Sequence, residues 1–343
     1  MTKLGIYNYY GVYNHNKIFD SSANLPIGED VTYTYRYLAM EARRKGIHIS
    51  TIDTEPLDSY DAIIFLDFPT YHNQYFNKLI EEKSENLFLF LHENELIRPD
   101  NWKISNFRHF QRVYTWHDEL VDNKFFFKLY QPNKIPVSFS IDLNEKKKFC
   151  CLIAWNKSSN HKLELYSERV RAIRWFEKNA PSSFDLYGQG WNDPTFPGVL
   201  QPLNRIIALK KRFAYRFSPH YPSYKWGVIS KNDVLKKYKF AICYENARDI
   251  PGYITEKIFD CFFAGCIPIY RGASNITDYI PETTFIDWRK FGSYGELFQY
   301  MKNMSETEYL DYIQSIEKFV NGPKIFPFSA ENYVNTVFQV LVD

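Results

Sequence analysis

The stretch from Tyr238 to Gly272 constrains the fold more than any other part of the chain. It begins with a continuous apolar run, Phe240 to Tyr244, which is typical of a parallel strand covered on both faces. Thr255 then has the position of a helix N-cap, an apolar stripe at helical spacing follows, and Gly265 fits the C-terminal cap. A second buried strand starts at Cys266. The pattern predicts a β–loop–α–β unit, as found in parallel sheets.

The start of this helix carries a lysine in an unusual place. Glu256 and Lys257 fall in the first turn, where a cation opposes the helix dipole by about 0.3–1 kcal/mol. A lysine at this position is stabilising if the helix N-terminus binds an anion, because free backbone N–H groups and a lysine together bind phosphate well. Asn246 stands in the loop before it, at the carboxyl end of a strand, where open α/β sheets bind ligands. Two interpretations stay open at this point: a nucleotide-phosphate site and an ordinary surface helix start.

Composition places the chain among globular proteins. Its 343 residues are 45% hydrophobic and 24% charged, which is enough material for two cores. A net charge of +2 gives no electrostatic case for binding nucleic acid. Aromatic residues make up 18% of the chain, which suits sugar stacking as well as core packing. The sequence does not specify an oligomeric state.

The expected location rests on hydropathy and on the cysteines. No stretch approaches the roughly 20 apolar residues that span a bilayer, and no signal peptide precedes the first expected strand. The five cysteines show no CxxC spacing and stand mostly in apolar contexts. We therefore expect buried free thiols in a reducing compartment, and so a cytoplasmic protein.

Strands and helices alternate twice along the chain. Strands are predicted over 4–9, 47–52, 62–67, 86–91, 112–116, 149–155, 184–188 and 284–287, and helices over 30–45, 73–83, 163–178, 294–320 and 329–342. Such alternation predicts an α/β fold with parallel sheets. The charged stretch 144–148 is a plausible boundary between two halves.

This organisation predicts the GT-B architecture, with two Rossmann-like domains facing a central cleft. The expected N-terminal domain spans 1–143 and binds the acceptor, and the expected C-terminal donor domain spans 144–328. A final helix, about 329–343, would pack back on the first domain. One divided domain is the alternative.

Two glutamates, Glu93 and Glu95, closely follow the predicted buried strand 86–91. A glutamate there suits a general base, because partial desolvation raises its pKa toward neutrality. The alternative is a polar loop that carries solvated glutamates.

The predicted helix 163–178 carries Arg169, Arg171 and Arg174. One or two of these can face a cleft, and arginine suits a diphosphate because its planar fork binds bidentately. Sequence position does not say which one does. The chain has no D-x-D triplet, no zinc spacing and no glycine-rich nucleotide loop. Any diphosphate would then be neutralised by side-chain cations and helix N-termini, so we expect no metal and no cofactor.

The segment 204–226 is both basic and aromatic. A solvated loop or helix of the donor domain is the favoured interpretation. The alternatives are contact with an anionic membrane surface and a part in holding an acceptor.

Several ordered motifs resemble the α-1,3-fucosyltransferase family, glycosyltransferase family ten. They are Tyr238-Lys239-Phe240, Tyr244-Glu245-Asn246, Tyr253-Ile254-Thr255-Glu256-Lys257, Ala264-Gly265, Ile267-Pro268-Ile269, Gly272 and Phe285-Ile286, with weaker matches at Glu93-Asn94-Glu95, Ser167-Glu168-Arg169 and Asp185-Leu186-Tyr187-Gly188. The likeness covers most of residues 85–325 and is strong over 238–290.

The resemblance implies an inverting, metal-independent transfer of L-fucose from GDP-fucose to a sugar hydroxyl. The acceptor would be GlcNAc of an N-acetyllactosamine-type glycan, with an α-1,3 linkage. By the same resemblance, Glu93 would be the general base, and Arg169 and Lys257 would neutralise the GDP diphosphate. Glu256 would bind the ribose. The other donor-site residues implied are Glu245, Asn246, Tyr253 and Thr255. The acceptor-binding residues are not implied.

The chain departs from the family pattern at three places. Ala247 replaces a serine, the loop 247–252 is one residue longer, and two extra residues stand between Glu95 and Pro99. The last departure makes Glu95 a rival for the base. The sequence shows neither the membrane anchor nor the C-terminal cysteine motif of the animal members, so we expect it to resemble the soluble bacterial members. A transferase of another GDP-sugar and a non-catalytic glycan-binding protein are the competing hypotheses.

Overall fold

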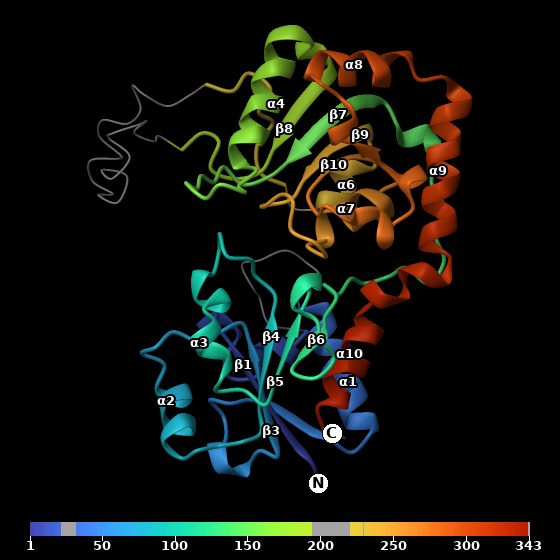
Figure 1. Cartoon of the computed structure of the whole chain (residues 1–343). Helices are drawn as coiled ribbons and strands as arrows, with labels where there is room; N and C mark the ends of the chain where they lie inside the picture. Colours follow the sequence, from blue (N-terminus) through green and yellow to red (C-terminus); the bar gives the residue numbers. More distant parts are fainter. Residues whose placement is uncertain (22–31, 194–219, 229, 342–343) are drawn as a thin grey trace.

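The computed structural model describes residues 1–21, 32–193, 220–228 and 230–341. The chain forms two lobes, each built on a parallel sheet (Figure 1). The first sheet has the strand order β2-β1-β3-β4-β5-β6 and the second has the order β11-β10-β9-β7-β8. The prediction of an α/β fold with parallel sheets is therefore confirmed.

The first lobe is made from these elements: β1 (Lys3–Asn8), α1 (Tyr33–Arg44), β2 (His48–Thr51), β3 (Ala62–Leu66), α2 (Gln74–Glu81), β4 (Leu87–Leu91), α3 (Ile104–Phe107), β5 (Arg112–Thr115) and β6 (Phe126–Lys128). The strand β6 was not predicted, because three residues give no periodicity to read. The other strands of this lobe lie within two residues of the predicted bounds.

The central strands β3 and β4 are buried along their whole length. Their alternate side chains enter two different cores: Ile64 and Phe90 pack with α1 and α10, whereas Phe65 and Leu89 pack with α2. A parallel strand covered on both faces is apolar throughout for this reason.

The second lobe is made from β7 (Lys148–Ile153), α4 (Tyr166–Asn179), β8 (Phe184–Tyr187), α6 (Lys231–Leu235), β9 (Tyr238–Tyr244), α7 (Glu256–Phe263), β10 (Ile267–Arg271), β11 (Ile286–Asp287), α8 (Tyr294–Asn303) and α9 (Glu306–Val320). The predicted β–loop–α–β unit is present as β9, α7 and β10. Ile242 of β9 pairs in parallel with Ile269 of β10. Thr255 is the N-cap of α7, as predicted.

The final helix, α10 (Ala330–Gln339), packs on the first sheet. The chain crosses from α9 to α10 along one side of the molecule, and both termini lie in the first lobe (Figure 1). Val334 and Val337 of α10 share a core with Leu38 of α1. The exact bounds 1–143 and 144–328 of the two domains stay a prediction.

The five cysteines are all free and buried, and all lie in the second lobe. Burial raises the pKa of the Cys150 and Cys151 thiols well above their usual value. The expected buried free thiols are therefore confirmed. Most of the basic and aromatic segment, 204–219, lies outside the described residues.

Two glycines close helices in the same left-handed conformation and make a matched test of stability. Gly46 after α1 has φ +70° and open space around it, whereas at Gly265 after α7, with φ +63°, an added Cβ would collide with Ile141. Gly46→Ala should cost about 1–2 kcal/mol of unfolding free energy from backbone strain alone. Gly265→Ala should cost about 1–3 kcal/mol more, because of the overpacking. Urea unfolding followed by circular dichroism measures both, and equal losses would contradict this packing argument.

Candidate active site

The carboxyl ends of the two sheets face each other, and side chains meet between them. Tyr253 of the second lobe packs on Trp116 of the first, with ring centroids 4.6 Å apart. His161 of the second lobe lies 3.4 Å from the Glu95 carboxylate of the first. The strand ends of both lobes therefore line one cleft, where open α/β sheets bind ligands.

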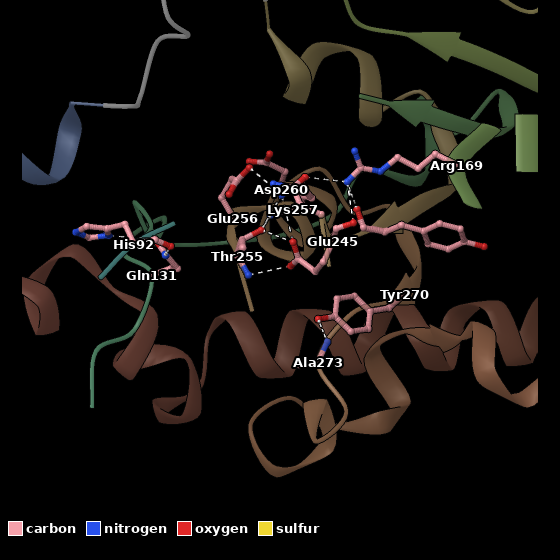
Figure 2. A network of polar contacts seen from close by, with 12 residues as sticks. His92, Gln131, Arg169, Glu245, Thr255, Glu256, Lys257, Asp260, Tyr270 and Ala273 are labelled. Atoms are coloured by element: carbon pink, nitrogen blue, oxygen red, sulfur yellow. Dashed lines mark hydrogen bonds and ion pairs between the residues drawn. The ribbon is translucent and has the colours of Figure 1, made fainter. Parts of the chain in front are cut away.

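Glu245, directly after β9, is the centre of a buried polar network (Figure 2). One carboxylate oxygen accepts the backbone N–H of Thr255 at 2.9 Å, and the other accepts the Thr255 hydroxyl at 2.7 Å. The second oxygen also lies 3.2 Å from Lys257 Nζ. The Glu245 side chain is 0% exposed, so this carboxylate supports the start of α7 from inside the lobe.

Lys257 is held by these groups and remains partly exposed. Its Nζ donates to Thr255 Oγ1 at 3.0 Å, and 25% of its side chain is accessible. Burial lowers the pKa of Lys257, but the carboxylates of Glu245 and Glu256 outweigh burial, so the pKa is raised overall. Lys257 is therefore a cation held in a fixed position at the N-terminus of α7, and part of its side chain is exposed to the cleft.

Arg169 of α4 is the one buried arginine of the three on this helix. Its Nη2 donates to the carbonyl oxygens of Tyr244 at 2.7 Å and Glu245 at 2.9 Å, and to Asn246 Oδ1 at 3.1 Å. Arg169 thus caps the carboxyl end of β9, beside the network that holds Lys257. Arg171 is largely exposed, with 68% of its side chain accessible.

Glu93 follows β4 and is half-buried on the opposite side of the cleft. Burial raises its pKa to about 7, and the nearby Asp67 carboxylate adds to the increase. Across the cleft, Lys257 lowers this pKa and Glu256 raises it. A carboxyl group with a pKa near neutrality can take a proton at pH 7.

Asp67 holds the backbone that carries Glu93. Its Oδ1 accepts the N–H groups of His92 at 2.8 Å and Glu93 at 3.1 Å, and the Asn101 amide at 2.7 Å. Asp67 is buried and has φ +65°. No pattern in the sequence singled it out, because its role depends on three segments that meet only in the fold.

The rival carboxylate Glu95 is in a different setting. It is exposed, and its side chain reaches His161 rather than the interior of the cleft. His92 is fixed by Tyr333 of α10, whose hydroxyl lies 3.1 Å from its Nε2, and burial lowers its pKa. The structure therefore gives Glu93 the setting of a base, while the choice of base stays a prediction.

The remaining predicted donor residues lie on the loop between β9 and α7 and at the start of α7. Asn246 is half-buried and orients the Arg169 guanidinium, and Tyr253 is buried against Trp116. Glu256 is half exposed at the first turn of α7. Burial raises its pKa, but Lys257 and Lys231 outweigh this effect, so the pKa is lowered overall and the group is charged.

The lobes are joined next to this loop. Asp118 of the first lobe accepts hydrogen bonds from Asn275 Nδ2 at 2.8 Å and the Tyr279 hydroxyl at 2.6 Å, and pairs with Lys128. Asn275 in turn accepts the N–H of Gly252 at 2.8 Å. Gly252 has φ +79°, and a Cβ there would collide with the Trp116 carbonyl. Only glycine lets the lobes approach this closely.

A polar cavity of about 380 Å³ lies at the start of α4. Its lining includes His161, Glu168, Arg248 and Arg271. Among the described residues, no cluster of His, Cys, Asp and Glu side chains has an arrangement that could hold a metal ion. In the same part of the chain, no helix is both long and apolar enough to cross a membrane.

Solved structures of two glycosyltransferases superimpose on this chain. A crystal structure of an α1,3-fucosyltransferase superimposes with a TM-score of 0.60 and 16% identity, covering 100% of this chain and 90% of that one. An α-glucosyltransferase, solved with UDP and DNA, superimposes with a TM-score of 0.56 and 13% identity over the full length of both chains. Two parallel-sheet lobes facing one cleft, together with these matches, define the GT-B fold.

The chain belongs to glycosyltransferase family 10. The model of that family, described as glycosyltransferase family 10 (fucosyltransferase) C-term, matches residues 143–325, more than half of the chain. An α-(1,4)-fucosyltransferase of Arabidopsis thaliana is 42% identical over 72 residues, which cover 21% of this chain and 18% of the relative. The α-(1,3)-fucosyltransferase FucT of Helicobacter pylori is 34% identical over 90 residues, covering 26% and 19%. The matched stretches thus span about a fifth of these relatives' lengths.

The support that Glu245 gives to α7 can be tested by substitution. In Glu245→Gln, Lys257 Nζ loses its buried carboxylate partner, so the unfolding free energy should fall by about 1–3 kcal/mol. Glu256→Gln removes a neighbouring carboxylate that is half exposed, so the loss should stay below about 1 kcal/mol. Thermal unfolding at pH 7 compares the two variants. A Glu245→Gln protein as stable as the wild type would rule out the buried support.

Proposed function

We propose that this chain is an inverting fucosyltransferase that moves L-fucose from GDP-fucose to a hydroxyl of an acceptor glycan. The observation that carries the proposal is the position of Glu93, a carboxyl with a pKa of about 7, across the cleft from Lys257. Arg169 lies beside Lys257 in the same lobe, since both contact Glu245. Membership of family 10 supports the fucosyl donor. One α1,3-fucosyltransferase with the same fold was solved with GDP-fucose.

The two cations would act on the leaving group. As the bond between C1 of fucose and the β-phosphate oxygen breaks, the electron pair and negative charge pass to GDP. Lys257 and Arg169 are already fixed in position, so they would stabilise that charge without reorganising. We infer that these two cations neutralise the diphosphate, as a divalent ion does in metal-dependent transferases, so that no metal is required. The polar cavity beside α4 has a size within the range of ligand sites and offers room for the rest of the nucleotide.

Glu93 would act on the acceptor. Its carboxylate takes the proton of the acceptor hydroxyl while that oxygen forms a bond to C1 on the face opposite GDP, so the anomeric configuration inverts. We propose GlcNAc of an N-acetyllactosamine-type glycan as the acceptor and an α-1,3 linkage as the product. We also propose a cytoplasmic location, supported by the five buried free thiols, with contact of 204–226 to the membrane as the alternative.

The donor is tested by measuring GDP release with GDP-fucose, and separately with other GDP-sugars, against a panel of N-acetyllactosamine acceptors. Release should be observed with GDP-fucose. Turnover of another GDP-sugar alone would identify a different transferase of the same class. Glycan binding without turnover of any nucleotide sugar would indicate a glycan-binding protein.

The choice of base is tested by a pair of isosteric variants. Glu93→Gln should lower kcat by about 100- to 10,000-fold and leave GDP affinity unchanged, because proton transfer is lost while the donor side is intact. Glu95→Gln should keep kcat within a few-fold of wild type, because Glu95 is exposed and turned to His161. The reverse pattern would make Glu95 the base.

The pH dependence of kcat/KM gives a second test. The base must be deprotonated, so activity should rise with pH through about 7, the pKa of Glu93. Asp67→Asn keeps an oxygen for the two N–H groups but removes a charge that raises this pKa. The rising limb should therefore move to lower pH in this variant. A limb in the same place in both proteins would contradict the assignment of Glu93.

A further inference from the structure

Tyr166, the first residue of α4, has a buried hydroxyl without a protein partner. The residue is 4% exposed, and its hydroxyl oxygen makes no hydrogen bond in the structure. Two other buried tyrosine hydroxyls of this lobe do have partners. The Tyr294 hydroxyl donates to the Glu168 carboxylate at 2.7 Å, and the Tyr270 hydroxyl accepts the Ala273 N–H at 3.0 Å. Tyr166 differs from these two in having no partner within the fold, a property that it shares in this lobe with Tyr309.

An unpaired hydroxyl in this position destabilises the free protein. A buried donor without an acceptor carries its full desolvation penalty, and phenylalanine of nearly the same shape would not. Such a group calls for an explanation, and a ligand that is present only in the complex supplies one. Nothing in the sequence marked Tyr166, which directly precedes the matched segment Ser167-Glu168-Arg169.

The surroundings of this hydroxyl identify the kind of ligand. The Arg169 guanidinium lies 5.2 Å from the centroid of the Tyr166 ring. The charges of Arg169 and Lys257 lower the pKa of Tyr166 and that of Glu93 raises it, while burial raises it most. The Tyr166 ring therefore lies beside Arg169, and the charges of Lys257 and Glu93 also act on its hydroxyl.

We propose that the Tyr166 hydroxyl donates a hydrogen bond to a non-bridging oxygen of the donor's diphosphate, as a neutral third contact beside Arg169 and Lys257. The inference rests on the proposed function. A phosphate oxygen is the acceptor that these two cations select, and it satisfies the hydroxyl that the protein leaves unpaired. The hydrogen bond gains strength as negative charge collects on the leaving GDP, so Tyr166 contributes to kcat as well as to affinity.

Tyr166→Phe is the direct test, and Tyr309→Phe is its matched control. Tyr309 of α9 also has a buried hydroxyl without a partner, and it packs near Phe240, in the core of the same lobe. Both variants remove one unpaired oxygen, so neither should lower the melting temperature. Tyr166→Phe should weaken GDP binding about 10-fold by titration calorimetry and lower kcat/KM for GDP-fucose about 10- to 100-fold. Tyr309→Phe should change neither quantity.

The outcomes separate failure of this inference from failure of the proposed function. Wild-type protein that binds neither GDP nor a GDP-sugar would remove the proposed function itself. Wild-type protein that binds GDP, together with a Tyr166→Phe variant of unchanged GDP affinity, would overturn the role of Tyr166 alone. A lower melting temperature with unchanged GDP affinity would make the hydroxyl structural. A change confined to the KM for the acceptor would assign it to the sugar instead.

Discussion

The site depends on one buried carboxylate at the end of β9. Glu245 binds both the N–H and the hydroxyl of Thr255, and it pairs with Lys257. The carbonyl of the same residue accepts a hydrogen bond from Arg169. One residue therefore sets the positions of two cations that reach the cleft from different helices. Because this carboxylate is removed from water, its charge must be balanced from within the protein, and Lys257 is held in place before any ligand arrives.

The part of the site formed by β9, α7 and β10 could be predicted from sequence because its signals are local. The N-cap at Thr255, the glycine at Gly265, the apolar stripe between them and the apolar runs on either side specify the β–loop–α–β unit without reference to the rest of the chain. By contrast, Glu245 was expected among the donor ligands, and the structure gives it a supporting place inside the lobe. The Glu245 side chain is buried because α7 packs against β9, and the sequence does not reveal this packing. Whether Glu245 also contacts the donor stays a prediction.

Other parts of the site depend on tertiary contacts. Among them, Arg169 was singled out only by the likeness of Ser167-Glu168-Arg169 to the family motif. Arg169 could not be chosen over its neighbours on the same helix by position alone, since the choice depends on which face of α4 meets β9. Asp67 acts through the backbone of residues 92 and 93, which lie far from it in the sequence. Tyr166 is distinguished by a buried hydroxyl that has no hydrogen-bond partner, and burial is a property of the folded chain. The three-residue strand β6 was missed because its pairing with β5 is what makes it a strand.

The uneven distribution of cysteine between the two lobes has a practical consequence. Every cysteine of this chain lies in the second lobe and is shielded from solvent, while the first lobe has none. A thiol-selective alkylating reagent can therefore react with these cysteines only when the second lobe opens. Because the modification is irreversible, each modified thiol shows that its surroundings have opened. Cys150 and Cys151 would report on β7, and Cys261 on α7, which carries Lys257. Mass spectrometry of the labelled peptides would then measure how often the second lobe opens, separately from any motion in the first.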